Sequence, residues 1–167
     1  SAIKEKQFPP SLYEKICSEI PESYEIAITG TKSDRAQNPE FEPLIKLSQT
    51  HFEDASFQEL ASRLRAAKLV ISVDTACMHL AVAVGAPTLC LASAAYVGEI
   101  VPYDATLSPP NVRFIYKTMD CQGCLGDCHL PSVQGMYPCV AQLTEDVILK
   151  QIRKRLKIGP TPGNSSV

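Results

Sequence analysis

The chain has 167 residues, about the size of a single domain with one continuous core. Apolar residues make up 45% of it and charged residues 20%, as is typical of a globular protein. The net charge of −2 argues against nucleic acid or an anionic membrane as the main partner, and no apolar run reaches the roughly 20 residues that a membrane-spanning helix needs. The first residues lack the layout of a signal peptide, so we expect a cytoplasmic protein.

The first third of the chain predicts a helix, a strand and a second short helix. Ser11 and Glu14 form a capping-box pattern at the start of the first helix, and Pro21 ends it. Residues 24–29 alternate towards a buried strand, which gives way to a polar loop. The second helix is expected over residues 39–47.

The middle of the chain predicts a helix, a buried strand and another helix. Ser56 and Glu59 form a second capping box. The β-branched run at residues 69–73 is typical of a parallel strand covered on both faces, and a helix of small residues is expected over 76–84. The side chains expected to face the core from the helix after Ser56 are Phe57, Leu60, Ala61 and Leu64.

Two further strands and a final helix complete the pattern. The strands are expected at residues 87–92 and 112–116, and Thr144 is expected to cap a helix over 145–156. Strands that alternate with helices indicate an α/β fold, a Rossmann-like parallel sheet with helices on both faces. We expect one domain over residues 1–157 and a disordered tail over 158–167.

The order of elements suggests that one strand of this sheet is missing. The chain begins with a helix, whereas sheets of this class normally begin with a strand. We therefore expect the first strand, and whatever precedes it, upstream of Ser1.

One junction between a strand and a helix carries the candidate chemistry. Ligands of open parallel sheets bind at the carboxyl ends of the strands, and Asp74 and Thr75 follow the strand at 69–73. Thr75 and the first free amides of the next helix can donate to phosphate oxygens, and the helix dipole favours an anion there. His79 lies about one turn into that helix. The alternative is that Asp74 is only a helix cap and His79 only a core residue.

The segment from Ser72 to Pro87 resembles the signature of the family 9 glycosyltransferases, which include heptosyltransferases. It reads Ser-Val-Asp-Thr-x-x-x-His-Leu-Ala-x-Ala-x-Gly-x-Pro. Lys6-Gln7-Phe8-Pro9 is similar to the Lys-x-Trp-Pro of the family, and the late cysteines with residues 144–147 resemble its C-terminal end. Two departures are Ala76, where the family has glycine, and Phe8, where it has tryptophan.

The resemblance implies the two-domain GT-B fold, with this chain as the C-terminal half that binds the nucleotide-sugar donor. Its implied donor-binding residues are of three kinds. Asp74, Thr75 and the Ala76 amide would hold the diphosphate-sugar portion with His79 nearby, and Lys6 would neutralise the phosphates. Asp34, or alternatively Glu40, would accept hydrogen bonds from the ribose. Tyr96 and Glu99 would either touch the sugar or base or be ordinary loop residues.

The same resemblance places the general base in an N-terminal domain that this chain does not contain. We therefore expect no catalytic residue in this fragment and donor binding without useful turnover. The implied role is hexosyl or heptosyl transfer in the synthesis of a surface glycan such as lipopolysaccharide or capsule. The expected partners are a nucleotide-diphosphate-sugar, with an ADP-sugar favoured, and a glycan acceptor bound by the missing domain. Membrane contact would be peripheral at most, at the inner face of the inner membrane, and no cofactor is required.

Seven cysteines are many for this length. Three of them, Cys17, Cys77 and Cys90, lie in apolar segments and are interpreted as small buried hydrophobic residues. The other four lie in a Gly- and Pro-rich segment, residues 121–139, and their spacing is compatible with a structural zinc site. A disulfide and reduced, packed thiols are the alternatives, and His129 could replace one ligand. A non-catalytic binding module stabilised by such zinc is the second functional hypothesis. The four candidate ligands are Cys121, Cys124, Cys128 and Cys139.

Overall fold

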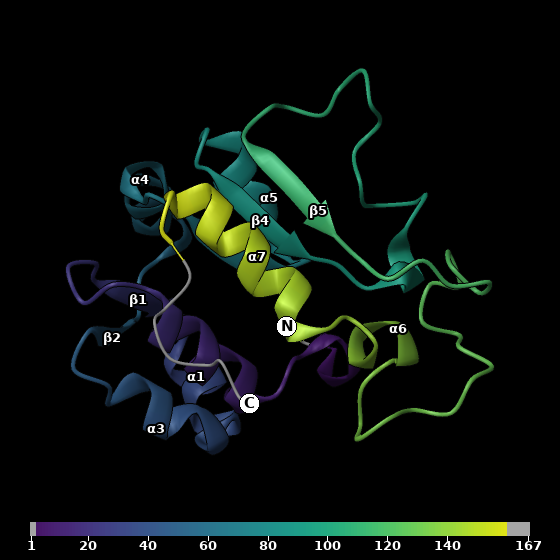
Figure 1. Ribbon diagram of the computed structural model, residues 1–167, viewed down its shortest axis with the longest axis horizontal. Helices are drawn as coiled ribbons and strands as arrows, with labels where there is room; N and C mark the ends of the chain where they lie inside the picture. The colour runs from purple at the N-terminus through teal and green to yellow at the C-terminus, as the bar shows by residue number, and fades with distance from the viewer. Residues whose placement is uncertain (1–2, 160–167) are drawn as a thin grey trace.

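Parallel strands alternate with helices in the computed structural model, which describes residues 3–159 (Figure 1). The strands are β1 (Ile26–Thr29), β2 (Thr50–Glu53), β3 (Val70–Val73), β4 (Thr88–Leu91) and β5 (Val112–Ile115). The α-helices are α1 (Pro10–Glu19), α2 (Lys32–Gln37), α3 (Glu42–Ile45), α4 (Phe57–Ala66), α5 (Ala76–Ala83), α6 (Pro138–Ala141) and α7 (Glu145–Leu156). Three short 3-10 helices are η1 (Lys4–Lys6), η2 (Pro39–Phe41) and η3 (Ala94–Tyr96). The α/β class predicted from the sequence is confirmed.

The strands form two parallel sheets. One sheet pairs β1 with β2, and the other has the order β3-β4-β5. A doubly wound sheet has the order 3-2-1-4-5-6, so the order seen here is that of such a sheet without its first strand. Among the described residues no strand joins β1 to β3. This arrangement fits the expectation of a further strand between them, which stays a prediction.

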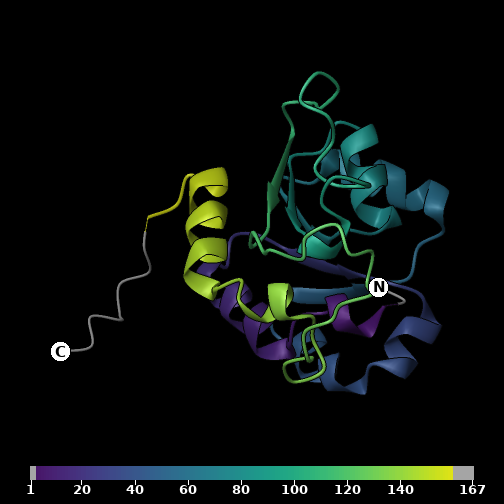
Figure 2. The same ribbon diagram turned by 90° about the vertical axis from the view of Figure 1, so that its right-hand side faces the viewer.

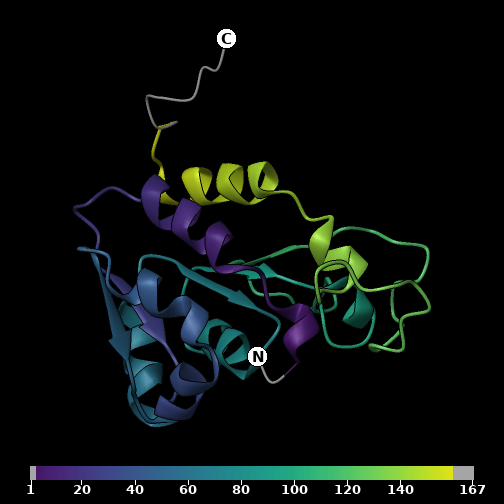
Figure 3. The ribbon, with the colours of Figure 1, turned by 90° about the horizontal axis from the view of Figure 1, so that it is seen from below.

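β4 is the centre of the core because both of its faces are covered. All four of its residues are buried. Leu89 and Leu91 face the cluster that contains α1 and α7, whereas Cys90 faces the cluster formed by α5 and the segment after η3. Figure 2 shows α7 on one side of the strands and the helices α4 and α5 on the other, and Figure 3 shows α1 lying alongside α7. The alternation of side chains along β4 thus builds a three-layer domain.

Several predicted boundaries in the first third of the chain are wrong. α1 begins at Pro10, whose fixed φ suits a first helical position, so Ser11 lies inside the helix and does not cap it. The polar loop predicted after the first strand contains α2, which has no buried residue and therefore no hydrophobic period to reveal it. The helix predicted over residues 39–47 is split into η2 and α3. β2 was not predicted.

The capping box at Ser56 is confirmed, but one core residue predicted beside it is wrong. The Ser56 hydroxyl accepts a hydrogen bond from the Glu59 amide, and the Glu59 carboxylate accepts one from the Ser56 amide. Phe57, at the first position of α4, is 59% exposed instead of facing the core, whereas Leu64 is buried. Thr144 is the N-cap residue of α7, although its side chain makes no capping hydrogen bond.

The element that positions the candidate site is α5, which begins directly after β3 and packs against both β3 and β4. Gly85 follows this helix with φ +83°, the left-handed conformation that glycine adopts without a steric penalty. None of the helices in the described part of the chain combines the length and the apolar character needed to cross a membrane. Residues 160–167, most of the predicted disordered tail, lie outside the described residues.

Candidate functional site

A buried ion pair joins the start of the chain to the end of β3. The Lys6 Nζ lies 2.8 Å from the Asp74 Oδ2, and the two side chains are only 8% and 2% exposed. The same Nζ donates a hydrogen bond of 2.9 Å to the Asp74 carbonyl oxygen and lies 4.3 Å from the centre of the Tyr96 ring. Lys6 is therefore held by three contacts of complementary charge, which bring Lys6, Asp74 and Tyr96 together. Their role in donor binding stays a prediction.

Asp74 retains an unused acceptor. Its Oδ1 is buried and has no hydrogen-bond partner among the described residues. The pKa of the nearby Cys90 thiol is raised, mainly by burial and to a smaller extent by the negative charge of Asp74. The interpretation of Asp74 as a helix cap is wrong, because the N-cap residue of α5 is Thr75. A buried carboxylate oxygen without a donor is costly, and it marks a place where a ligand hydroxyl would be stabilised.

The N-terminus of α5 lacks a side-chain cap. The Thr75 side chain makes no capping hydrogen bond, and its hydroxyl lies 3.3 Å from the Ser72 hydroxyl and donates weakly to the Val73 carbonyl. The first intrahelical bond runs from the His79 amide to the Thr75 carbonyl. The amides before it, beginning with Ala76, are the free donors of the helix, and they lie next to the Lys6–Asp74 pair. This end of α5 can bind an anion.

The His79 ring points to the segment after η3. Its Nδ1 lies 2.6 Å from the Tyr103 hydroxyl, and the two ring centres are 5.7 Å apart. Tyr103 also packs edge-on against Phe114, with ring centres 5.2 Å apart. Burial raises the pKa of the Tyr103 hydroxyl. The ring is thus partly buried and hydrogen-bonded, which is compatible with the alternative of a satisfied core histidine, and a role of His79 in donor binding stays a prediction.

A cavity of about 800 Å³ opens beside His79. His79 and Val82 of α5 line one wall, and Glu99, Tyr103 and Tyr116 contribute to the others. Glu99 thus lies in this cavity, whereas Tyr96 lies under Lys6. The sequence had grouped Tyr96 and Glu99 together as residues of one loop, and the structure assigns them to neighbouring but different parts of the site.

Asp34 has a structural role at the start of α2. Its Oδ2 accepts hydrogen bonds from both the amide and the hydroxyl of Thr31, 2.9 and 2.7 Å long. These bonds lower the pKa of the Asp34 carboxyl, the side-chain bond from Thr31 being the largest cause. Asp34 makes no contact with the Lys6–Asp74 pair in the described structure. Glu40, the alternative, lies in η2. The proposed ribose contact stays a prediction for both.

Two residues near the site were not predicted for it. Ser93, just after β4, is 1% exposed and its hydroxyl has no hydrogen-bond partner among the described residues. Cys77, in the first turn of α5, lies 4.0 Å from the Thr29 hydroxyl at the end of β1 and is only partly buried. Ser93 follows the carboxyl end of β4, and Cys77 lies in the first turn of the helix that follows β3. Ligands of parallel sheets bind at the carboxyl ends of strands, and this rule, which identified Asp74, could have found both residues.

The late cysteines lie in or next to the segment that packs on η3. Burial and then the neighbouring Cys128 and Cys124 thiols raise the pKa of Cys121, so these three lie near one another. Cys139 is buried at the start of α6 and faces the backbone of η3. All seven cysteines are free, and within residues 3–159 no three His, Cys, Asp or Glu side chains form a group that could hold a metal ion.

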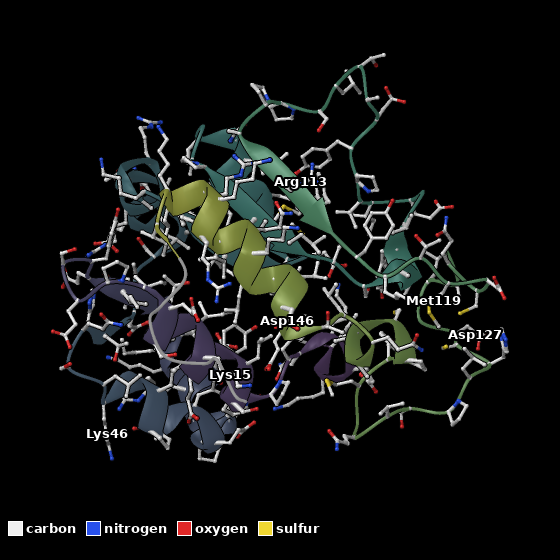
Figure 4. The ribbon with its side chains drawn as sticks, viewed as in Figure 1. Lys15, Lys46, Arg113, Met119, Asp127 and Asp146 are labelled. Carbon is white, nitrogen blue, oxygen red and sulfur yellow. The ribbon has the colours of Figure 1, made fainter. Side chains whose placement is uncertain are left out.

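The cysteine segment packs against the site from outside. The Gly123 and Leu125 amides donate to the carbonyls of Ala94 and Ala95 in η3, with bonds of 2.9 and 2.8 Å. The Tyr137 amide donates to the Glu5 carbonyl in η1. Figure 4 labels Asp127 within this segment and Met119 just before it, at the end of the molecule where Figure 1 labels α6. It supports the two short helices that carry Lys6 and Tyr96.

The sequence matches the profile of glycosyltransferase family 9 (heptosyltransferase) over residues 1–122. That range contains the Lys6–Asp74 pair, α5 and every residue that lines the cavity. No curated protein and no solved structure matches the chain.

Proposed function

Because this chain belongs to glycosyltransferase family 9, we propose that it binds the nucleotide-diphosphate-sugar donor of glycosyl transfer, with the diphosphate at the N-terminus of α5. The free amides of the first turn would donate to the phosphate oxygens, and the helix dipole would favour their charge. Lys6 would supply the compensating positive charge from the buried pair with Asp74.

The observation that carries this proposal is the unpartnered Oδ1 of Asp74 beside the uncapped helix. A carboxylate repels phosphate, so Asp74 would not contact the diphosphate itself. Its Oδ1 would instead accept a hydrogen bond from a hydroxyl of the donor, while Oδ2 stays paired with Lys6. One ion pair thus offers an acceptor for the sugar and a neutralising charge for the phosphates.

The same arrangement suits the chemistry of glycosyl transfer. When the bond between the sugar and the diphosphate breaks, negative charge builds on the leaving diphosphate. A preorganised lysine and a helix N-terminus stabilise that charge without having to reorganise. The acceptor hydroxyl needs a general base within about 3 Å of its proton, and we assign no residue of this chain to that role.

We propose further that the transfer serves a surface glycan such as lipopolysaccharide or capsule, that the donor is an ADP-sugar, and that the acceptor is bound by a separate N-terminal domain. Under this proposal the chain alone binds donor and does not turn over. The reaction would take place in the cytoplasm, at the inner face of the inner membrane.

Thermal unfolding in the presence of nucleotides tests the proposal. A nucleoside diphosphate at 100 times its dissociation constant should add about 2.7 kcal/mol to the free energy of unfolding. ADP, UDP and GDP are compared with the monophosphates AMP, UMP and GMP, which lack one phosphate for the helix end. Absence of a shift with all three diphosphates, at millimolar concentration, would contradict the proposal.

A further inference from the structure

Two partly buried thiols meet where the loop 121–128 folds back on itself. Its backbone reverses direction through three positive φ angles of 79°, 53° and 95°, at Gly123, Leu125 and Gly126. The two ends of the loop come together, because the side chains of Cys121 and Cys128 are hydrogen-bonded to each other. Both thiols are only partly buried, so a dissolved reagent can reach them. The folded loop therefore already brings two sulfur atoms into contact.

The part of the loop between these two cysteines is attached to η3. The Gly123 and Leu125 amides donate hydrogen bonds of 2.9 and 2.8 Å to the first two carbonyls of that helix. A Cβ atom at Gly126 would lie only 2.7 Å from the Tyr137 hydroxyl and 3.6 Å from the Tyr96 hydroxyl. The backbone of the loop thus lies directly against the side chain of Tyr96.

Tyr96 connects the loop to the buried ion pair. The centre of its ring lies 4.3 Å from the Lys6 Nζ, and that Nζ lies 2.8 Å from the Asp74 Oδ2. A bond that fixes the loop against η3 therefore also fixes the ring that faces the charge of Lys6. The Cys17, Cys90 and Cys139 thiols are buried, which protects them from a dissolved reagent.

We propose that Cys121 and Cys128 form a reversible disulfide bond by exchange with a small disulfide such as oxidised glutathione, and that this bond fixes the loop on η3. The Cys128 thiolate attacks one sulfur of the small disulfide, whose S–S bond breaks and releases a first thiol. The Cys121 thiolate then attacks the Cys128 sulfur and releases the second thiol. Two protein thiols are oxidised, the small disulfide is reduced, and the two protein protons pass to the released thiolates.

The bond has two consequences for the protein. It closes the loop 121–128, which removes conformational freedom from the unfolded chain and so stabilises the folded one. It also keeps the Gly123 and Leu125 amides on η3, and hence the Tyr96 ring against Lys6. A partly exposed disulfide is open to attack by a reducing thiol, so the change is reversible. Only the effect on donor binding rests on the proposed function.

Oxidation of the 167-residue chain in a mixture of oxidised and reduced glutathione tests the proposal. We expect the chain to lose two of its seven free thiols and the mass of two hydrogen atoms, and peptide mapping to find Cys121 linked to Cys128. The melting temperature should rise by about 5 °C, and dithiothreitol should reverse both changes. The oxidised chain should bind ADP about threefold more tightly than the reduced chain, because the Tyr96 ring is already ordered.

Two variants of the same loop assign the effect to one pair of thiols. Cys121→Ser should abolish the rise in melting temperature on oxidation. Cys124→Ser is the matched control, because it removes a thiol from between the two partners and should leave that rise unchanged. If Cys121→Ser does not fold, peptide mapping of the unchanged protein and the Cys124→Ser control still decide the assignment.

The outcomes separate this inference from the proposed function. The disulfide is overturned if the folded chain keeps all seven thiols while the urea-unfolded chain loses them, if mapping links other cysteines, or if Cys124→Ser also loses the stabilisation. It is likewise overturned if the thiols hold zinc instead. If the bond forms but ADP binds both forms equally, its coupling to the Lys6 side is overturned. If the bond forms and no nucleoside diphosphate binds, the disulfide stands and the proposed function fails.

Discussion

The buried pair of Lys6 and Asp74 makes the sharpest prediction for stability. We consider the single changes Lys6→Met and Asp74→Leu and the double change that combines them. Each single change leaves one charge inside the protein without its partner, whereas the double change leaves two apolar side chains of similar size. The account predicts that the single changes are severe and that the double change is mild.

The geometry sets the magnitude. Two unit charges 2.8 Å apart attract by about 6 kcal/mol at an effective dielectric constant of about 20. Loss of one partner of such a buried pair typically costs about 3–5 kcal/mol, and replacement of both is often close to neutral. Since a domain is stable by only about 5–15 kcal/mol, each single change removes a large part of the total.

Urea unfolding of the four proteins gives the coupling energy of the pair directly. We expect the double variant to be more stable than either single variant, with a coupling of about 3 kcal/mol or more. Lys15→Met is the control, because Lys15 pairs with Glu145 at the surface and should cost at most about 1 kcal/mol. Additive single changes, or single changes as mild as the control, would refute the reasoning. If a single variant does not fold and the double variant does, the coupling is also shown.

Three further predictions concern α2, α1 and the cysteines. Thr31→Ala should destabilise the protein by about 1 kcal/mol through the lost cap, and it should raise the pKa of Asp34 towards its ordinary value, which NMR titration measures; an unchanged pKa would contradict the capping role. Burial raises the pKa of Tyr13 to about 12 from 10.0, so the unfolded state ionises first and stability linked to this group falls as the pH rises from 10 to 12. In Tyr13→Phe the free energy of unfolding should fall less between pH 10 and pH 12 than it does in the unchanged protein. Denaturation curves at the two pH values measure this, and an equal fall in both proteins would contradict the prediction. For the zinc prediction, metal analysis and chelation decide: one zinc per chain with unfolding on chelation would support a four-cysteine site, whereas no bound zinc and an unchanged melting temperature would contradict it.

The sequence predicted the elements that have a strong hydrophobic pattern. The β-branched run before Asp74 and the all-buried residues of β4 mark the centre of the sheet, and the rule of carboxyl ends then locates the site. α2 is polar on all sides and β2 has four half-buried residues of mixed polarity, so neither carries a periodic signal. The sequence therefore predicted the helices and strands whose side chains are deeply buried, and missed those that are mostly exposed.

Contacts made at long range were beyond the sequence. The Lys6–Asp74 pair joins residues 68 positions apart, and only the family resemblance suggested that both belong to one site. The pairing of His79 with Tyr103 depends on a loop that folds back on α5, and no local pattern encodes it. Asp34 shows the reverse case, because its capping box with Thr31 is local and the residues Thr-x-x-Asp were readable.

The central claim is that the first turn of α5 holds a diphosphate, and amide NMR tests it most directly. A ¹⁵N-labelled chain is titrated with ADP and, for comparison, with AMP. The account predicts saturable binding of ADP with its largest shifts at the amides of Ala76, Cys77 and Met78, and a much weaker response to AMP. Saturable binding whose largest shifts lie away from α5, with these three amides unmoved, would contradict it.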